Sequence, residues 1–262
     1  MTFVIGEVHA INKREPGLIA EDNFATGHCN WVQLLNGNVG AGVVYLDSRI
    51  VHESPYSLCV GTGYQSSIGE GTQGYGAAFK RLSRGPVLGK VYAHWKFAYG
   101  SEGGENYPRN VDFGLDQCDP DGERRFFKIR WLNYDEATST RVSKFQVNGD
   151  PASTWIDVPG AAIDLGFNEA KRNLFDVEAV FDATTGKYDG LRVNGLGFGT
   201  LATDSEGAPQ PDATMQALSG PHPHTLNQFK GGMNVGIEVY NRLQVAGSPA
   251  WVNLAYFKAV AL

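Results

Sequence analysis

Ionisable and hydrogen-bonding side chains recur at every second position in several stretches of this chain, and their types are suited to chemistry. They are Tyr92, His94, Lys96, Lys128, Arg130, Lys144, Gln146, Asp176, Glu178, Glu238 and Tyr240. Flat aromatic rings can stack on sugar rings, and the forked donors of arginine suit hydroxyls or carboxylates. If these side chains share one surface, the mixture predicts recognition of an oligosaccharide or polysaccharide.

The same residue types leave an eliminating enzyme open as an alternative. A base such as His94 or Tyr92 would remove a proton from a uronate polymer. A cation such as Arg130 would neutralise the neighbouring sugar carboxylate. Together these residues would suit a polysaccharide lyase.

A hydrolase is the second enzymatic alternative. Glu178 with Asp176, or with Glu238, would supply the two carboxyl groups that glycoside hydrolysis needs. Two alternatives need no catalysis: an ordinary solvated face with cross-strand ion pairs, or a structural role in which an exposed sheet pairs with another protein. The sequence does not decide between cleavage and binding, so we assign no catalytic residue.

Two further groups contain metal-ligand types. Residues 116–123 hold four acids whose oxygens could bind Ca²⁺, but their Pro-Asp-Gly segment favours a tight turn. His222 and His224 place two imidazoles close together, yet a zinc site needs more ligands than the sequence supplies there. We therefore predict no metal site or cofactor, with a structural Ca²⁺ as the alternative.

Residues 69–74 spell a glycine-rich GxGxxG motif. No His-Arg-Asp segment follows it, as a protein kinase would require. It also lacks the preceding apolar strand and following helix of a dinucleotide-binding motif. A loop between strands is the better interpretation.

The five tryptophans divide into two kinds. Four are expected in the core, where large aromatic side chains bury the most area: Trp31, Trp95, Trp131 and Trp251. Trp155 follows the turn sequence of residues 148–151 and has a loop-like setting. It is the best candidate for a platform on which a sugar ring stacks.

Composition excludes some partners. Acidic residues outnumber basic ones 28 to 22, the net charge is −6 and no run of Lys and Arg occurs, so we predict no nucleic-acid partner. The three cysteines, Cys29, Cys59 and Cys118, form no CxxC pair. An odd number without that spacing argues against a disulfide framework or zinc site and favours a reducing compartment.

The chain lacks the hydrophobic stretches that membranes require. No run approaches the ~18 apolar residues of a membrane-spanning helix, so we predict no membrane partner. Residues 1–9 lack the basic and apolar regions of a signal peptide. We therefore expect a cytoplasmic protein, or a secreted one if a leader has been removed. The sequence does not predict an oligomeric state.

Hydrophobic residues alternate with polar ones in residues 91–99, 124–134, 174–181, 235–240 and 252–260. A period of two is typical of an antiparallel strand with one buried face. The side chains expected in the core are Val91, Ala93, Trp95, Phe97, Phe127, Ile129, Trp131, Phe175, Val177, Ala179, Phe181, Val235, Ile237, Val239, Val252, Leu254, Tyr256 and Val260.

The alternating runs predict an all-β fold. Roughly fourteen strands are expected, separated by turn signals at the spacing of a β-sandwich. The one candidate for a helix, near residues 168–172, is about a turn long. With 42% hydrophobic and 19% charged residues and no shift in composition, we predict a single two-sheet antiparallel jelly-roll domain over residues 1–262.

Diffuse motifs along most of the chain carry a family resemblance. They are Asp22–Phe24, Trp31, Ser57–Val60, Val91–Phe97, Lys128–Trp131, Phe175–Val177, Tyr188–Asn194 and Val252–Val260. The chain resembles the concanavalin A-like lectin/glucanase superfamily and, more closely, a bacterial family within it whose members are mostly uncharacterised. The resemblance implies two curved antiparallel sheets, with glycan binding or cleavage usually on the concave face.

The chain departs from the superfamily's enzymes. The glucanases carry Glu-x-Asp-x-Glu on one strand, whereas Asp112 and Asp116 are the nearest acids here. The residue sets of jelly-roll polysaccharide lyases are not matched as motifs. The resemblance therefore favours glycan recognition on a concave sheet face. The candidate substrate-binding residues are Tyr92, His94, Lys128, Arg130, Lys144, Gln146, Asp176 and Glu178.

Overall fold

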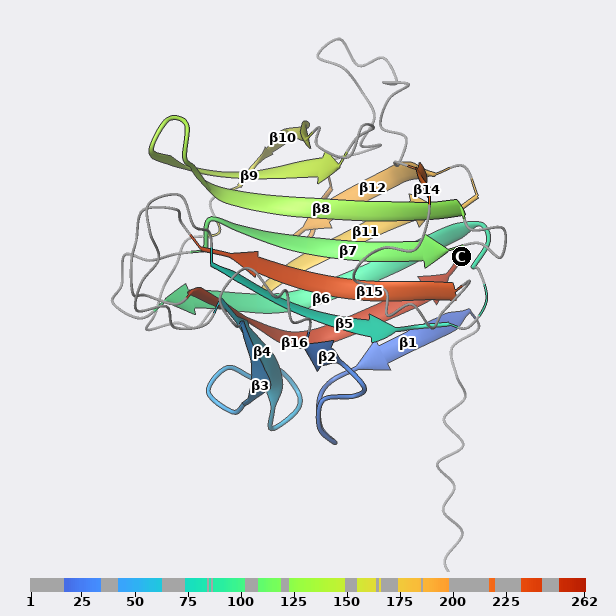
Figure 1. Cartoon of the computed structure of the whole chain (residues 1–262), viewed down its shortest axis with the longest axis horizontal. Helices are drawn as coiled ribbons and strands as arrows, with labels where there is room; N and C mark the ends of the chain where they lie inside the picture. The colour runs from blue at the N-terminus through green and yellow to red at the C-terminus, as the bar shows by residue number, and fades with distance from the viewer. Residues whose placement is uncertain are drawn as a thin grey trace, which may run out of the picture.

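Two antiparallel sheets packed face to face make up the described part of the chain (Figure 1). The computed structural model describes residues 17–33, 42–62, 74–83, 85, 87–101, 108–118, 123–148, 155–163, 165, 174–184, 186–197, 217–219, 232–241 and 250–262. Within these ranges there are sixteen strands and no helix. None of these residues forms a helix long and apolar enough to cross a membrane. The all-β prediction is confirmed, whereas residues 168–172 lie outside the described ranges.

Sheet A has eight strands. Seven are hydrogen-bonded in the order β13 (Leu196–Gly197), β12 (Lys187–Val193), β11 (Phe175–Asp182), β6 (Lys90–Ser101), β16 (Ala250–Ala261), β4 (Ser57–Gly61) and β3 (Val43–Asp47). The eighth, β1 (Leu18–Asp22), also pairs with β16. All neighbouring strands in this sheet are antiparallel.

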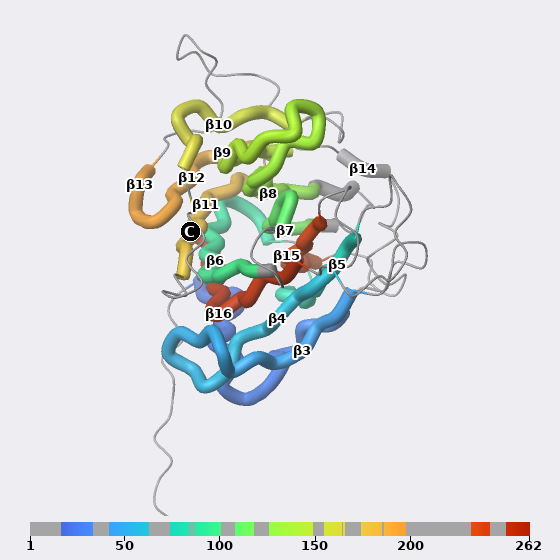
Figure 2. The backbone as a smooth tube through the Cα atoms, turned by 90° about the vertical axis from the view of Figure 1, so that its left-hand side faces the viewer, coloured from blue at the N-terminus to red at the C-terminus, as the bar shows by residue number. Residues whose placement is uncertain are grey.

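Sheet B also has eight strands. Seven follow the order β10 (Trp155–Ala162), β9 (Thr140–Asn148), β8 (Glu123–Asp135), β7 (Asn110–Cys118), β15 (Gly232–Tyr240), β5 (Tyr75–Arg81) and β2 (Val32–Gln33). The eighth, β14 (Ala217–Ser219), pairs with β8. Figure 2 shows the two layers edge-on, with β8, β7, β15 and β5 on one side and β11, β6 and β16 on the other.

The chain crosses repeatedly between the two layers. The steps from β4 to β5, β5 to β6, β6 to β7, β10 to β11 and β15 to β16 each change sheet. Strands that follow one another in sequence therefore often lie in different sheets. This connectivity decides which polar faces come together.

The core fills the space between the sheets with the predicted alternating side chains. Trp95 of sheet A and Trp131 of sheet B are both fully buried. Aromatic rings meet across the interface, with centroids 5.0 Å apart for Phe97 and Phe113 and 4.8 Å apart for Phe127 and Phe181. These separations lie in the range favoured by tilted aromatic pairs. The predicted inward faces of β6, β8 and β11 are confirmed.

The inward face of β16 differs from the prediction after Leu254. The register of β16 against β6 shifts between Leu254 and Tyr256, so an extra residue is inserted there. Such a bulge reverses the alternation. Phe257 becomes a core residue, whereas Tyr256 is only half-buried and donates a hydrogen bond to Glu21, so its predicted core position is wrong.

Trp251 also departs from its predicted place in the core. It is half-buried, and its strand partners in sheet A are Gly61 and Gly100. A Cβ at Gly100 would lie 2.5 Å from Cζ2 of the indole. The missing side chain therefore gives the Trp251 ring room to lie against the sheet outside the core.

Candidate functional site

The two sheets divide the eight candidate residues between opposite sides of the sandwich. Sheet A carries Tyr92 and His94 on β6 and Asp176 and Glu178 on β11, whereas sheet B carries Lys128 and Arg130 on β8 and Lys144 and Gln146 on β9. Both groups alternate with core residues and therefore point away from the interface between the sheets. The expectation that all eight share one hollow is wrong.

This separation removes two catalytic arrangements. His94 or Tyr92 cannot act with Arg130, because they lie on the outer faces of different sheets. Glu178 and Glu238 are separated in the same way. The sequence could not reveal this, since alternation defines two faces of a strand but not its neighbours.

The candidate residues of sheet A form cross-strand pairs. The Tyr92 hydroxyl donates to Glu178 at 2.7 Å, and His94 Nε2 lies 2.7 Å from Asp176 Oδ1. Burial would raise the pKa of Asp176, but its hydrogen bond to His94 and the charge of Lys96 lower it overall. This half-buried face matches the cross-strand ion pairs of an ordinary solvated sheet.

Sheet B holds a tighter set of charges, which we call the sheet B cluster: Asp112, Lys128, Arg130 and Glu238. Lys128 Nζ lies 2.8 Å from Glu238 Oε2 and 3.1 Å from Asp112 Oδ2. Arg130 donates two hydrogen bonds to Asp112, from Nε at 2.8 Å and from Nη2 at 2.9 Å. Three neighbouring strands, β8, β7 and β15, thus join through their outward side chains.

Asp112, Lys128 and Glu238 are buried, and Arg130 is half-buried, although their side chains point outward. Asp112 is 0% exposed. Burial alone would raise its pKa, but the charges of Arg130 and Lys128 outweigh burial and hold the pKa at about 2. Burial would lower the pKa of Lys128, but Glu238 and Asp112 raise it overall. Asp112, Lys128 and Arg130 therefore stay ionised near neutral pH.

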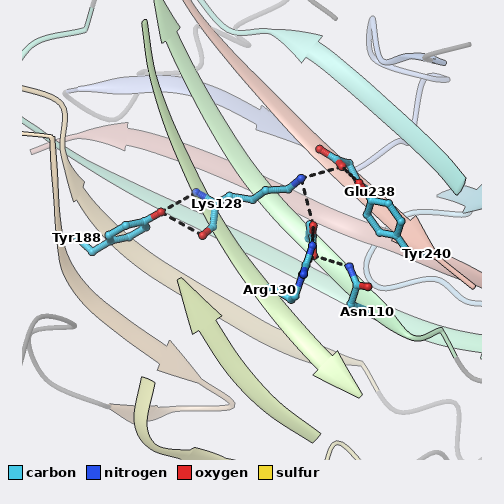
Figure 3. A network of polar contacts seen from close by, with 7 residues as sticks. Asn110, Lys128, Arg130, Tyr188, Glu238 and Tyr240 are labelled. Carbon is cyan, nitrogen blue, oxygen red and sulfur yellow. Dashed lines mark hydrogen bonds and ion pairs between the residues drawn. The ribbon is translucent and has the colours of Figure 1, made fainter. Parts of the chain in front are cut away.

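Several neighbours hold the cluster in place. Asn110 donates to Asp112 at 2.7 Å, and the Tyr240 hydroxyl donates to Glu238 at 2.6 Å. From sheet A, the Tyr188 hydroxyl accepts the Lys128 backbone N–H at 2.9 Å and donates to its carbonyl at 3.1 Å (Figure 3). The backbone N–H and C=O of Lys128 bond to Tyr188, and its ammonium group bonds to two carboxylates. Lys128 is therefore held in one position.

Glycines on β7 and β15 make space beside the Lys128 side chain. Gly114 pairs with Lys128 and with Gly236. A Cβ at Gly114 would lie 3.1 Å from the Phe126 ring, and one at Gly236 would lie 2.3 Å from the Phe79 ring. Two aromatic rings therefore cover the glycines on this face, and the Lys128 ammonium lies 5.4 Å from the Phe126 centroid.

Towards β10 the polar network becomes accessible, and we call this part the rim: Lys144, Gln146, Trp155 and Asp157. Asp157, which is 58% exposed, accepts from Gln146 Nε2 at 2.7 Å and from Lys144 Nζ at 2.8 Å. The Arg130 guanidinium carbon lies 3.6 Å from the centroid of the half-buried Trp155 ring. Trp155 is the first residue of β10, so its predicted loop setting is wrong.

Asn148 is a buried polar residue of this face that sequence reasoning missed. Its strand partner on β10 is Trp155, and it is 3% exposed. Its Oδ1 is buried and has no hydrogen-bond partner among the described residues. Asp112 was also left out of the outward set, although the alternation of Asn110, Asp112 and Asp116 with apolar residues could have placed it there.

The pKa directions argue against three groups of this face as acid–base catalysts: Asp112, Tyr240 and Tyr75. Asp112 is ionised, buried and bound to Arg130, so it cannot serve as a general acid. Burial, together with the charges of Glu238 and Asp112, raises the pKa of Tyr240 and of Tyr75. Both phenols therefore stay protonated near neutral pH, so neither is available to accept a proton. The accessible rim instead offers polar groups and a flat ring, which suit hydroxyl-bearing rings.

No group of three or more potential metal ligands occurs within the described ranges. The two metal candidates lie largely elsewhere: residues 119–122, His222 and His224 are outside these ranges. Only Gly74 of the GxGxxG motif is inside them. The possible Ca²⁺ site therefore stays a prediction.

Comparison with solved structures confirms the jelly-roll prediction. The lectin UEA-II complexed with galactose matches with a TM-score of 0.50 and 9% identity, covering 93% of this chain and 98% of that chain. The Ca²⁺-bound exoplasmic/lumenal domain of VIP36 has a TM-score of 0.49 and 10% identity, covering 94% and 90%. A carbohydrate esterase from Shiga toxin-encoding bacteriophage phi24B has a TM-score of 0.45 and 10% identity, covering 94% and 99%.

These likenesses concern the fold. No protein-family model matches the chain, and no curated protein matches its sequence. The resemblance to a bacterial family within the superfamily stays a prediction. With its two antiparallel sheets and its similarity to the lectin UEA-II, the chain has the concanavalin A-like jelly-roll fold.

Proposed function

We propose that this protein binds a glycan on the outer face of sheet B, over the sheet B cluster and the rim. The observation that carries the proposal is the contact of Arg130, held by the buried Asp112, with the half-buried Trp155 ring. The guanidinium lies over one face of the ring, so a fixed cation and a flat ring are stacked there. Such pairs of features recognise molecules that have both an apolar ring face and polar edges.

The fixed geometry of the cluster supports this proposal. Burying a charge is costly, and a buried ion pair adds little stability compared with well-packed apolar residues. A site held rigid by its own hydrogen bonds, however, loses less entropy when a ligand binds. We infer that the cluster supports the rim in a conformation ready for binding.

A row of polar side chains leads from the exposed rim into the buried sheet B cluster. One cross-strand row runs from Asp157 through Gln146, Arg130 and Asp112 to Glu238. It spans five strands, or about 19 Å at the usual spacing between neighbouring strands.

Binding measurements on variants of the two faces test the proposal. Array screening would identify a glycan, and calorimetry would compare Trp155→Ala and Gln146→Ala with wild type. We expect each variant to bind at least about tenfold more weakly, or about 1.4 kcal/mol. Asp176→Asn and Tyr92→Phe, on sheet A, are the controls and should bind like wild type. Loss of binding in the sheet A variants alone would contradict the proposal.

The same sugars also test binding against cleavage. Reducing-sugar release would report hydrolysis, and absorbance of unsaturated uronates would report elimination. We expect the bound glycan to be recovered intact, because near neutral pH Asp112 has no proton to donate and the raised pKa of Tyr240 keeps its phenol protonated. Turnover that disappears in Glu238→Gln would instead show that this face is an active site.

A further inference from the structure

Every cation of the sheet B cluster and rim already has a carboxylate partner. Lys128 is paired with Glu238 and Asp112, Arg130 with Asp112, and Lys144 with Asp157. This set of groups thus balances three cations against three carboxylates. It has no excess positive charge to attract an acidic ligand.

These cations cannot readily change partners. If Arg130 or Lys128 turned towards a ligand carboxylate, Asp112 would lose part of its compensation while remaining 0% exposed. An uncompensated buried charge is strongly unfavourable. The side chain of Lys128 is also confined between Glu238 and the Phe126 ring.

One buried atom of sheet B that lacks a partner among the described residues is an acceptor. Asn148 Oδ1 has no hydrogen bond from any described residue, and its side chain points to the same outer face as Gln146. Its strand partner is Trp155, the proposed ring-stacking platform. A buried acceptor without a hydrogen bond lowers the stability of the fold, so a hydrogen bond donated to it by a ligand would be favourable.

We propose that the ligand is a neutral glycan that donates a hydroxyl proton to Asn148 Oδ1 while a sugar ring packs against Trp155. This inference rests on the proposed function of the sheet B face and specifies the class of ligand. It replaces the expectation that Arg130 would neutralise a uronate. A sugar hydroxyl is an O–H donor, whereas an ionised uronate carboxylate is an acceptor only.

Paired oligosaccharides test the charge of the ligand. The probes are tetrasaccharides of glucose, galactose and mannose, each compared with its counterpart oxidised to the uronate at C6. We expect a neutral member to bind at least about tenfold more tightly than its uronate, with little dependence on salt. The opposite result would be a uronate that binds more tightly than its neutral counterpart, in a salt-sensitive way, and loses this binding in Trp155→Ala. That result would show that the ligand is acidic while still supporting glycan binding on this face. Binding to neither series would overturn both.

An isosteric change tests the role of Asn148. Asn148→Leu removes the acceptor, so we expect the neutral tetrasaccharide to bind about tenfold more weakly while the melting temperature does not fall. If Asn148 only stabilised the fold, Asn148→Leu would lower the melting temperature and leave binding unchanged. Asn234→Leu makes the same change on β15 of the same sheet, where the strand partners are Asp116 and Arg81, and should leave binding unchanged. Unchanged binding by Asn148→Leu would contradict the proposed contact.

Discussion

At the scale of single residues, Asp112 determines how the sheet B cluster responds to change. Its carboxylate is fully buried and receives bonds from Arg130, Lys128 and Asn110. Each donor compensates part of one buried charge. Removing a donor should therefore lower the free energy of unfolding by more than a substitution at an exposed position on a strand.

Arg130→Met should destabilise the protein by about 3–5 kcal/mol, since it leaves Asp112 with one cationic partner. Urea-induced unfolding would measure the change. Arg192→Met is the matched control: Arg192 is 58% exposed and lies 3.9 Å from Glu178. The control should change stability by less than about 1 kcal/mol. Equal effects of the two variants would show that the Asp112 pair is no different from a surface pair.

The low pKa of Asp112 predicts a loss of stability in acid. A carboxyl group whose pKa is lower in the folded than in the unfolded protein stabilises the fold above its unfolded value, near pH 4. This contribution should disappear as the pH falls towards the folded value of about 2. Unfolding free energies measured from pH 7 to pH 2 should decrease mainly below pH 4, and a smaller decrease is expected for Asp112→Asn. A profile that is flat below pH 4 would contradict this account of Asp112.

At the scale of strands, close contact between the sheets depends on glycine. A Cβ at Gly76 of β5 would lie 2.0 Å from the carbonyl oxygen of Gly61 on β4. That atom belongs to the backbone, so it cannot move aside as a flexible side chain could. This contact joins the ends of two consecutive strands that belong to different sheets.

Gly76→Ala should therefore destabilise the protein by about 1–3 kcal/mol, the usual cost of overpacking. Thermal unfolding followed by circular dichroism would measure it. Gly197→Ala is the control, because a Cβ there meets nothing within 4 Å and the backbone does not require glycine. If Gly76→Ala were as stable as Gly197→Ala, the sheets would not be held in contact at this point.

Strand faces could be predicted from sequence because alternation is a local property. Trp95 and Trp131 are buried as expected, since each follows an uninterrupted period of two. The bulge before Tyr256 could not be predicted, because one inserted residue leaves no compositional trace. Asn148 looked like part of a turn, and only its register with Trp155 reveals its buried acceptor.

The candidate site was predictable only in part, because it depends on strand order. Lys128, Arg130 and Gln146 lie in sheet B, with Arg130 paired to Gln146, but His94 and Glu178 lie in sheet A. Alternation says which side chains share a face of one strand. It carries no information about pairing between strands far apart in sequence.

At the scale of the whole molecule, the sandwich presents two outer faces with different properties. The face of sheet A has half-buried cross-strand pairs, such as His94 with Asp176, together with the half-buried Trp251 ring. The face of sheet B has a buried, charge-balanced network with an accessible rim at β10. The account assigns binding to the second face alone, so the two faces can be compared within one molecule.

Tryptophan side-chain resonances provide the most direct test of this assignment. The chain has five tryptophans: Trp155 on the outer face of sheet B, Trp251 on that of sheet A, and Trp31, Trp95 and Trp131 buried. The indole N–H signals, assigned by substitution to phenylalanine, would be followed during titration with a neutral oligosaccharide selected on an array. The account predicts that the Trp155 signal moves while the Trp251 signal stays in place. Movement of Trp251 with an unchanged Trp155 would place the glycan on the opposite sheet and contradict the central claim.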